Sequence, residues 1–337
     1  MNSEKLLTVS SSPHVKGPTT VRGVMRDVLI AMIPAAIVSV ALFGFRSLLL
    51  IAVSVLGCEL SEFAVRKILK RPMSLGDLSA AVTGVLIAFN VPSGLPVWQL
   101  LIADAAAIIV AKQFFGGLGH NFANPAIFGR IVLLVSFPQA MSAYPMPFAW
   151  RVPVAVTTAT PLGTISSLGV SGNIADAMKA SDALPGLWEM FLGARQGSLG
   201  EVCAAALIVG GVYLVIRRVI SPLIPCVFVG TVFVFMFFAG HFSLYFALYE
   251  VLCGGLLLGA IFMATDYVTS PTVKWAKVVF AVGCGAVTSV IRLWGSLPEG
   301  VSYSILLMNI LAPSLDKLFY PRVFGAVKEK KKKGAAA

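Results

Sequence analysis

The chain has 337 residues, of which 58% are hydrophobic and only 12% are charged, and its formal net charge is +11. A soluble domain carries about 25% charged residues, so the composition excludes an ordinary soluble enzyme. Because helices satisfy their own backbone hydrogen bonds in lipid, the composition predicts an all-α polytopic membrane protein. The basic balance has a membrane explanation, given below, and implies no nucleic-acid partner.

A transmembrane helix needs about 20 consecutive apolar residues. The third hydrophobic segment is short and is interrupted by Gly84 and then by Asn90-Val91-Pro92. The first 27 residues are polar and lack the hydrophobic core of a signal peptide, so no cleavage is expected. In chain order, ten hydrophobic segments lie near 28–45, 47–65, 78–91, 96–113, 122–140, 198–216, 222–240, 244–263, 274–291 and 299–316.

The positions of the basic residues predict the orientation. With the N-terminus in the cytoplasm, 20 of the 26 Lys and Arg residues lie inside, five lie outside and Arg130 lies within a span. Cytoplasmic loops are enriched in Lys and Arg. We therefore expect a multi-pass protein with both termini in the cytoplasm and segment 141–197 at the outer face, and the family resemblance given below implies the bacterial inner membrane.

Ten spans divide into two sets of five. Gly84 to Pro92 in the first set resembles Gly259 to Pro271 in the second, unless chance produces the likeness. Since five is odd, the sets have inverted topology, and inverted repeats broken at matching positions, here expected at Gly84 and Gly259, suggest a site near the midplane. The expected divisions are a cytoplasmic segment 1–27, a first repeat 28–140, an outer loop 141–197, a second repeat 198–316 and a basic cytoplasmic tail 317–337.

Carboxylates at the membrane are functional candidates because a charge in lipid is costly. Asp77, Asp266 and Asp316 lie near the predicted cytoplasmic ends of broken or Pro-containing spans, where carboxylate and carbonyl oxygens suit a hard cation. Helix capping is the alternative for each. Asp104 lies deep in the fourth segment, with a structural or a functional role open.

Several other chemistries have no pattern to support them. Glu59 and Glu62 are either solvated or paired with Arg66. No cysteines have C-x-x-C spacing, so packing is expected and no metal site. The chain also shows no NAD fingerprint and no hydrolytic triad, so we do not expect it to act alone. The cysteines are Cys58, Cys203, Cys226, Cys253 and Cys284.

A Thr/Ala cluster, Thr157-Thr158-Ala159-Thr160-Pro161-Leu162, lies in the polar loop between the two sets of segments. By itself it suits an ordinary turn before a proline. It also resembles the acceptor sites at which some respiratory membrane proteins carry FMN through a phosphoester to threonine.

Four stretches in this order and spacing resemble the D subunit of the Rnf complex, the ion-translocating ferredoxin:NAD oxidoreductase. A close relative is the B subunit of the sodium-pumping NADH:quinone oxidoreductase, which usually has a longer N-terminus. The resemblance covers residues from about 17 to 322. The stretches are Asp77 to Gly84, Gly116 to Arg130, Thr157 to Leu162 and Met263 to Pro271.

The resemblance implies that Thr160 carries covalent FMN. The family motif has an acidic residue where this chain has Val154, which departs from the pattern. Thr157 and Thr158 are expected to hydrogen-bond the phosphate. Phe148 and Trp150 are expected neighbours of the flavin ring.

The resemblance also implies a second, non-covalent flavin, riboflavin, near Asn121 and Asn124, whose amides match the donors and acceptors of a flavin; capping of a broken helix before Pro125 is the alternative. The expected function is a flavin-carrying electron-transfer subunit of a membrane Rnf-type complex that moves Na⁺ or H⁺. Asp77, Asp266 and Asp316 are then ion-coupling candidates. A subunit of the sodium-pumping quinone reductase and a cofactor-free solute channel or transporter remain alternatives.

Overall fold

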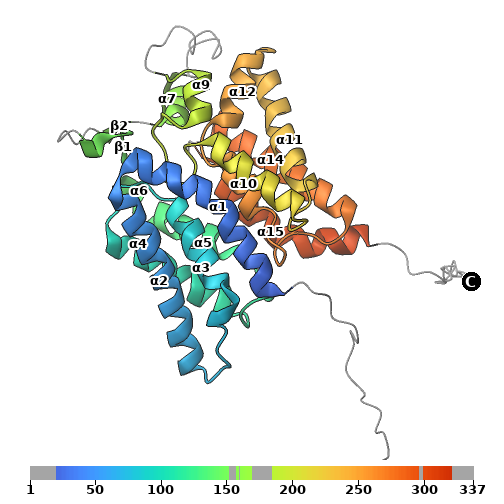
Figure 1. Cartoon of the computed structure of the whole chain (residues 1–337). Coiled ribbons are helices and arrows are strands. Elements are labelled where there is room, and N and C mark those ends of the chain that lie inside the picture. Colours follow the sequence, from blue (N-terminus) through green and yellow to red (C-terminus); the bar gives the residue numbers. More distant parts are fainter. Residues whose placement is uncertain (1–19, 152–156, 159, 169–183, 296–298, 321–337) are drawn as a thin grey trace, which may run out of the picture.

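The structure is a computed structural model that describes residues 20–151, 157–158, 160–168, 184–295 and 299–320. Apart from two two-residue strands, its regular elements are helices (Figure 1), as the composition predicts. Position 154, segment 1–19 and the basic tail from 321 onward lie outside the described residues.

The first half contains five long or broken helical segments. Helix α1 begins at Val21, seven residues before the predicted boundary, because the Thr20 hydroxyl caps it by accepting a hydrogen bond from the Gly23 N–H (3.1 Å). The elements are α1 (Val21–Phe43), α2 (Phe45–Ile68), η1 (Leu75–Asp77), α3 (Ser79–Phe89), α4 (Val97–Ala105), the π-helix η2 (Ala106–Gln113), α5 (Pro125–Ser136) and α6 (Pro138–Ser142).

The second half has the same number of segments, and a connection of short elements joins the halves. The connection contains β1 (Tyr144–Pro145), η3 (Ala149–Arg151), β2 (Thr157–Thr158), α7 (Pro161–Leu168) and α9 (Leu187–Leu192). The second half contains α10 (Ala204–Ile216), α11 (Leu223–Ala239), α12 (Leu244–Leu252), α13 (Leu256–Leu258), the π-helix η4 (Gly259–Met263), α14 (Lys274–Trp294) and α15 (Val301–Phe319).

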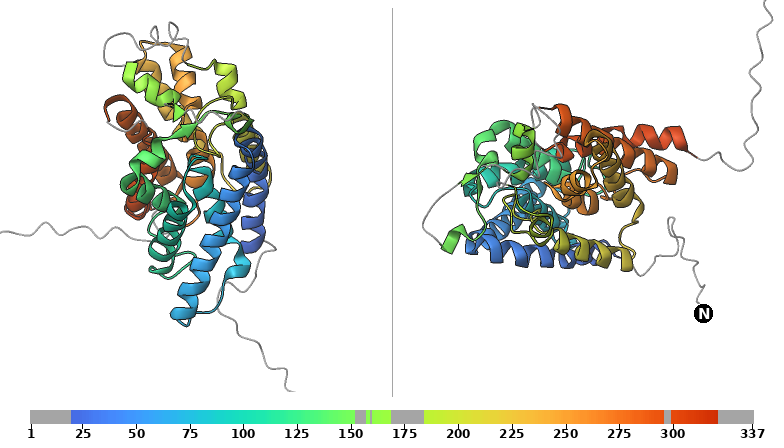
Figure 2. Two further views of the ribbon diagram at one scale, coloured as in Figure 1. Left: turned by 90° about the vertical axis from the view of Figure 1, so that its left-hand side faces the viewer. Right: turned by 90° about the horizontal axis from the view of Figure 1, so that it is seen from above.

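The two halves repeat a packing pattern. In the first half α2 packs against α3 and α4, and α5 packs against the same two helices. In the second half α11 packs against α12 and α14, and α15 packs against η4 and α14. The halves meet where α1 crosses α10 and where α5 crosses α15, as the two views of Figure 2 allow the reader to follow. At the first crossing Gly210 lets the α1 backbone approach, since a Cβ there would lie 2.2 Å from Ala31 O.

Two predicted breaks are in the wrong place. Gly84 does not interrupt α3; it lies against α2, where a Cβ would lie 2.7 Å from Ser54 O. The break in the second half falls at Cys253–Gly255 and not at Gly259, and it bends the chain by 65°. Gly254 has a φ of 59°, a conformation that favours glycine, which explains why the helix turns there.

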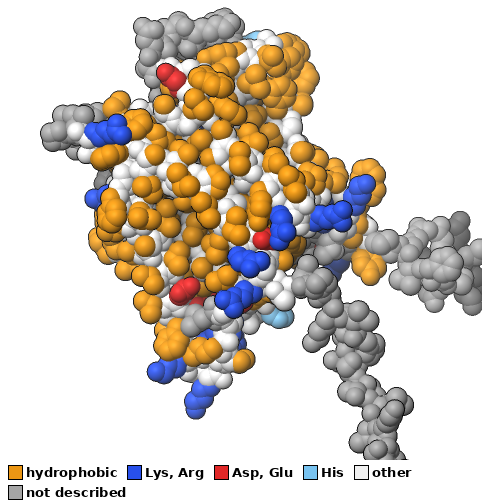
Figure 3. All heavy atoms as spheres, viewed as in Figure 1, with side chains coloured by type: hydrophobic (Ala, Val, Ile, Leu, Met, Phe, Trp, Pro, Cys, Tyr) orange, Lys and Arg blue, Asp and Glu red, His pale blue; other side chains and the backbone are white. Residues whose placement is uncertain are grey.

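The surface suits a bilayer. Hydrophobic side chains cover most of the face in Figure 3, whereas Lys and Arg gather mainly at its lower end. Among the described residues, α1, α2 and α14 are long and apolar enough to cross a membrane alone, and α12 with α13–η4 meets the same criterion as a bent pair. Helices α3, α5, α10 and α11 are apolar but shorter. The polytopic class is confirmed, while the count of ten spans stays a prediction.

Candidate functional site

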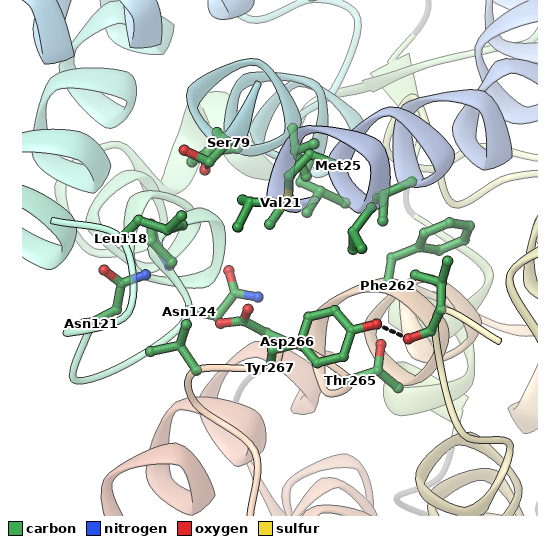
Figure 4. Close-up of a pocket in the computed structure, with 18 of the residues that line it drawn as sticks. Val21, Met25, Ser79, Leu118, Asn121, Asn124, Phe262, Thr265, Asp266 and Tyr267 are labelled. Atoms are coloured by element: carbon green, nitrogen blue, oxygen red, sulfur yellow. Dashed lines mark hydrogen bonds between the residues drawn. The ribbon is translucent and has the colours of Figure 1, made fainter. Parts of the chain in front are cut away.

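A cavity of about 470 Å³ lies between the two halves. Its walls come from the N-terminal part of α1, from α3, from the loop before α5 and from the segment that follows η4, and most of them are apolar. Charged and amide side chains enter this lining at Lys112, Asn121, Asn124 and Asp266, and hydroxyl groups enter it at Thr20, Ser79, Thr83, Thr265 and Tyr267. Figure 4 shows Asn124 and Asp266 side by side, with Asn121 at one end. A cavity of this size with few polar groups is typical of a cofactor site.

The loop before α5 brings both asparagines to the cavity. Gly116, Gly117 and Gly119 have φ values of 123°, 97° and 93°, which non-glycine residues rarely adopt. The glycines therefore give this loop a path that ordinary residues disfavour, and the loop leads directly into α5. The family stretch Gly116 to Arg130 thus has a structural basis.

The side-chain amide of Asn124 is occupied by hydrogen bonds within the protein. Its Oδ1 caps α5 by accepting a hydrogen bond from the Ala126 N–H (2.9 Å), and Pro125 begins the helix. Its Nδ2 donates to Met263 O in the other half (3.1 Å). The Asn309 amide, oriented by its hydrogen bonds, accepts from the Asn124 N–H (3.1 Å) and donates to Thr269 O (3.2 Å). Asn124 therefore ties the halves together.

Asn121 is different, because the fold does not use its amide oxygen. The Asn121 Oδ1 is buried and accepts no hydrogen bond from the described residues. A buried acceptor without a donor costs about 1–3 kcal/mol, so this oxygen is suited to accept from a ligand N–H or O–H. The side chain also borders a second, smaller cavity that contains Asp316. Of the two predicted asparagines, Asn121 fits a flavin and Asn124 fits the capping alternative.

A buried ion-pair network stands behind the cavity wall. Lys112, 1% exposed, donates from Nζ to Glu62 Oε2 (2.7 Å) and to the Ser79 hydroxyl (2.6 Å). Arg66 Nε and Gln113 Nε2 both donate to Glu62 Oε1 (each 3.1 Å). The predicted alternative of a Glu62–Arg66 pair is confirmed. Lys112 is thereby fixed as a charged group in the wall.

Both π-helices reach this cavity. Lys112 lies near the end of η2, while Ile261 and Phe262 of η4 contribute to the opposite wall. A π-helix contains one more residue per hydrogen-bonded turn than an α-helix and is often found at functional sites. No sequence pattern predicted either segment, because apolar runs do not distinguish the two helix types.

All three predicted ion-coupling aspartates accept hydrogen bonds, and Asp77 and Asp316 accept them at helix starts. Asp77 Oδ1 accepts from the Ser79 N–H (2.8 Å) at the start of α3. Asp316 accepts from the backbone N–H groups of Thr272 and Val273 just before α14 (2.9 to 3.1 Å). Asp266 Oδ2 accepts from the Thr269 hydroxyl (2.9 Å). Only Asp266 lines the main cavity, so the three carboxylates do not form one cluster.

Thr160 lies in the connection between the halves, at the start of α7. Strand β2, which contains Thr157 and Thr158, pairs with β1 and leads towards Thr160. The Thr160 Oγ1 accepts a hydrogen bond from the Gly163 N–H (3.1 Å), and Thr160 O accepts from the Thr164 N–H (2.9 Å). The hydroxyl thus sits at a helix N-terminus, which favours phosphate.

The aromatic residues Phe148 and Trp150 lie in the chain between β1 and β2. The Phe148 N–H donates to Leu42 O at the end of α1 (2.7 Å), and the Trp150 ring covers Gly44. Both rings are exposed, and the Arg151 guanidinium lies 5.0 Å from each ring centroid. The contacts place this connection at the α1–α2 turn, whereas the cavity lies at the other end of α1. Between Val28 at the cavity and Leu42 at the connection, α1 rises about 20 Å.

A second buried charge cluster was missed by the sequence reasoning. Arg130 donates to Asn90 Oδ1 (2.5 Å) and forms an ion pair with Glu299. Glu201 Oε2 lies 3.9 Å from the same guanidinium. These residues come from both halves and from the segment after the connection. The sequence did contain one signal of this cluster. Arg130 was predicted to lie within a span, and a charge in that position requires a partner.

Comparison with known proteins identifies the family of the chain. The profile of the NQR2, RnfD, RnfE family matches residues 8–325. The D subunit of the Na⁺-translocating ferredoxin:NAD⁺ oxidoreductase complex of Acetobacterium woodii is 39% identical over 331 residues, 98% of each chain. The D subunit of the proton-translocating ferredoxin:NAD⁺ oxidoreductase complex of Clostridium ljungdahlii is 40% identical over 325 residues, 96% of this chain and 97% of the relative. The resemblance stated from the motifs is confirmed, and the chain belongs to the NQR2, RnfD, RnfE family of membrane proteins.

Proposed function

We propose that the chain is a flavin-carrying electron-transfer subunit of a membrane complex that couples ferredoxin:NAD⁺ oxidoreduction to ion translocation. Its two relatives near 40% identity, of similar length, are named as the D subunits of such complexes. Other subunits of the complex are then its partners. The observation that carries the flavin part is the unpaired Asn121 acceptor, among the described residues, in a preformed cavity between the halves.

The first proposed cofactor is FMN, joined through its phosphate to the Thr160 hydroxyl. The position of Thr160 Oγ1 at the N-terminus of α7 supports this assignment, because backbone N–H groups there favour a phosphate. The ester bond tethers the cofactor and leaves its ring free. Thr157 and Thr158 precede this point in β2 and are the proposed additional donors to the phosphate.

The second proposed cofactor is riboflavin in the cavity between the halves. The apolar walls suit the flat ring, and Asn121 offers a buried acceptor to a ring N–H or a ribityl hydroxyl. Lys112, held by Glu62, places a positive charge in the same wall. Bound flavins supply the redox chemistry, while the protein positions them and sets their electrostatic surroundings.

The transported ion stays open in this proposal. The two relatives near 40% identity are named for Na⁺ in one case and for protons in the other. Asp266 is the strongest of the three proposed coupling residues because it borders the main cavity, which neither Asp77 nor Asp316 lines. Exchange of Asp266 for asparagine tests its role, since asparagine retains a cap but not the charge.

The Thr160 assignment can be tested without damaging the fold. Thr160→Asn retains a good helix cap but has no hydroxyl, whereas Thr160→Ser retains both. We expect in-gel flavin fluorescence after denaturation, and the mass of one FMN less water, in the original chain and in Thr160→Ser, but neither signal in Thr160→Asn. Covalent flavin retained by Thr160→Asn would place the attachment elsewhere. A chain without any flavin would favour the cofactor-free transporter.

The cavity assignment has its own test. Asn121→Ala removes one hydrogen bond, and a loss of about 1.4 kcal/mol corresponds to a tenfold weaker affinity. We therefore expect about tenfold weaker retention of non-covalent riboflavin in the purified complex, with the covalent FMN unchanged. Asn121→Ala that binds riboflavin as tightly as the original chain would contradict the cavity assignment and leave the Thr160 assignment standing.

A further inference from the structure

Asp104 of α4 is a fully buried carboxyl group in the interior of the first half. Its exposed fraction is 0%. Its Oδ1 lies 2.7 Å from the Ser54 hydroxyl and 3.6 Å from the Cys58 thiol, both on α2. Its Oδ2 is buried and accepts no hydrogen bond from the described residues. Gly57 makes room for this oxygen, because a Cβ there would lie 2.8 Å from it.

The hydrogen bonds of Ser54 indicate where a proton lies. Ser54 Oγ is 2.8 Å from Gly84 O and 2.7 Å from Asp104 Oδ1. A hydroxyl has one proton to donate, so with an ionised Asp104 one of these two contacts holds no proton. With a protonated Asp104, the carboxyl O–H donates to Ser54 Oγ and the Ser54 O–H donates to Gly84 O. Each of the two Ser54 contacts then holds a proton.

The surroundings of Asp104 contain, among the described residues, no positive charge that would hold it ionised. Among the described residues, the titratable side chain that contacts the Asp104 carboxyl group is Cys58. Arg130 on the neighbouring α5 is directed to Asn90 and Glu299 instead. Glu62 and Lys112 lie further along α2 and η2 and form an ion pair with each other. An isolated buried carboxylate is very costly and takes up a proton instead.

Glu62 provides an internal contrast on the same face of α2. It too is fully buried, but Lys112, Arg66, Gln113 and Ser74 all donate to its oxygens. Two buried carboxyl groups in one half therefore have opposite surroundings. Glu62 is surrounded by cations, whereas Asp104 contacts a single hydroxyl and a thiol.

We propose that Asp104 is a proton-binding site inside the membrane region, which holds a proton at rest and exchanges it as the complex turns over. The ligand is H⁺ and not Na⁺, because a hard metal cation requires several oxygen ligands. Ser54 Oγ is the only side-chain oxygen of the described residues that contacts the Asp104 carboxyl group. One proton needs one such partner.

A row of polar side chains on α2 leads from Asp104 towards the Lys112 network. Ser54, Cys58, Glu62 and Arg66 follow one another at intervals of four residues and so lie on one face of the helix. Eight residues separate Ser54 from Glu62, which is about 12 Å along the axis. The Lys112 network, which borders the flavin cavity, lies at one end of this row. Asp104 lies at the other.

Infrared spectroscopy of the assembled complex in membranes tests the resting state. The spectrum of the original complex minus that of Asp104→Asn is expected to contain the C=O stretch of an un-ionised carboxylic acid at pH 7. The matched control is Glu59→Gln, which removes another carboxyl group of α2 and is expected to leave the Asp104 acid band unchanged. Absence of the acid band in the Asp104 difference would overturn the proposal. Its loss on adding Na⁺ would also overturn it, in favour of a sodium site.

The exchange is tested by the same band during turnover. We expect the acid band to shift or diminish between the oxidised and reduced complex, and Asp104→Asn to lower coupled ion translocation at least tenfold with covalent FMN intact. An unchanged band, or translocation by Asp104→Asn at the original rate, would overturn the exchange. The resting-state band does not require either flavin, so its failure is distinguishable from a failure of the flavin assignments.

Discussion

The cavity between the halves and the Thr160 segment are built in opposite ways. The cavity is formed by packed helices of both halves and is held by Asn124, which bonds across them. The Thr160 segment consists of two two-residue strands and the short helix α7. A non-covalent ligand needs a preformed pocket. A covalent tether needs only an accessible hydroxyl at a position that favours phosphate, such as a helix N-terminus. Substitutions at the contacts that hold the two halves together should therefore cost stability and ligand together, and those at Thr160 should affect attachment alone.

The largest effect is expected from Glu62→Gln. It leaves the buried Lys112 ammonium without its carboxylate partner, and breaking a buried pair in this way costs about 3–5 kcal/mol. Thermal unfolding of the purified protein in detergent measures the change. Glu59→Gln, three residues away and without an ion pair among the described residues, is the control and should unfold like the original chain.

A smaller loss is expected from Gly210→Ala at the crossing of α1 and α10. The added methyl group would lie 2.2 Å from Ala31 O, and overpacking of this kind costs about 1–3 kcal/mol. Since Val28 of α1 and Leu214 of α10 line the cavity, non-covalent flavin should be lost as well.

Gly230→Ala is the matched control for that change. Gly230 lies within α11, and a Cβ there would meet nothing within 4 Å. Alanine is favoured over glycine in a helix by about 0.5–1 kcal/mol, so stability should rise slightly. Equal losses in the two variants would show that the close crossing is unimportant.

Asn124→Ala should destabilise by about 1 kcal/mol, the usual value of a lost helix cap, and more if the bond to Met263 also contributes. Asn121→Ala should stay within about 0.5 kcal/mol of the original, because its amide makes no hydrogen bond with the described residues. Chemical unfolding of the two variants side by side measures this. A larger loss in Asn121→Ala would contradict the division of roles between the two asparagines.

The smallest effect on stability is expected from Thr160→Asn. Asparagine caps helices at least as well as threonine, so the Thr160 hydrogen bond with Gly163 has a replacement. The unfolding temperature of the flavin-free protein should change little, although covalent flavin disappears. A marked loss of stability would mean that the Thr160 segment is as firmly integrated as the cavity.

The sequence predicted the helical segments well because lipid imposes long apolar runs. Each of the ten segments corresponds to an observed helix or a pair of helices. The Glu62–Arg66 pair was also within reach, since residues four apart share a helix face. The Glu62–Lys112 pair was not, because its members are 50 residues apart and only tertiary packing brings them together.

The same limit applies within the site. Asn121 and Asn124 are chemically identical and three residues apart, so composition and spacing cannot say which one caps the helix and which one is left for a ligand. Gly84 and Gly259 were predicted as breaks because glycine weakens helices. In the structure they allow close approach to Ser54 and Val301, which depends on the neighbouring helix and not on local propensity.

The π-helix η2 affects which single-residue deletions the chain can tolerate. Its wider turn accommodates a surplus residue between Ala106 and Gln113. Deleting one residue there would restore ordinary α-helical spacing, so the helix beyond it would keep its orientation. In the regular α-helix α14 the same deletion would rotate everything beyond it by about 100°. Single-residue deletions should therefore be better tolerated in this stretch than in α14.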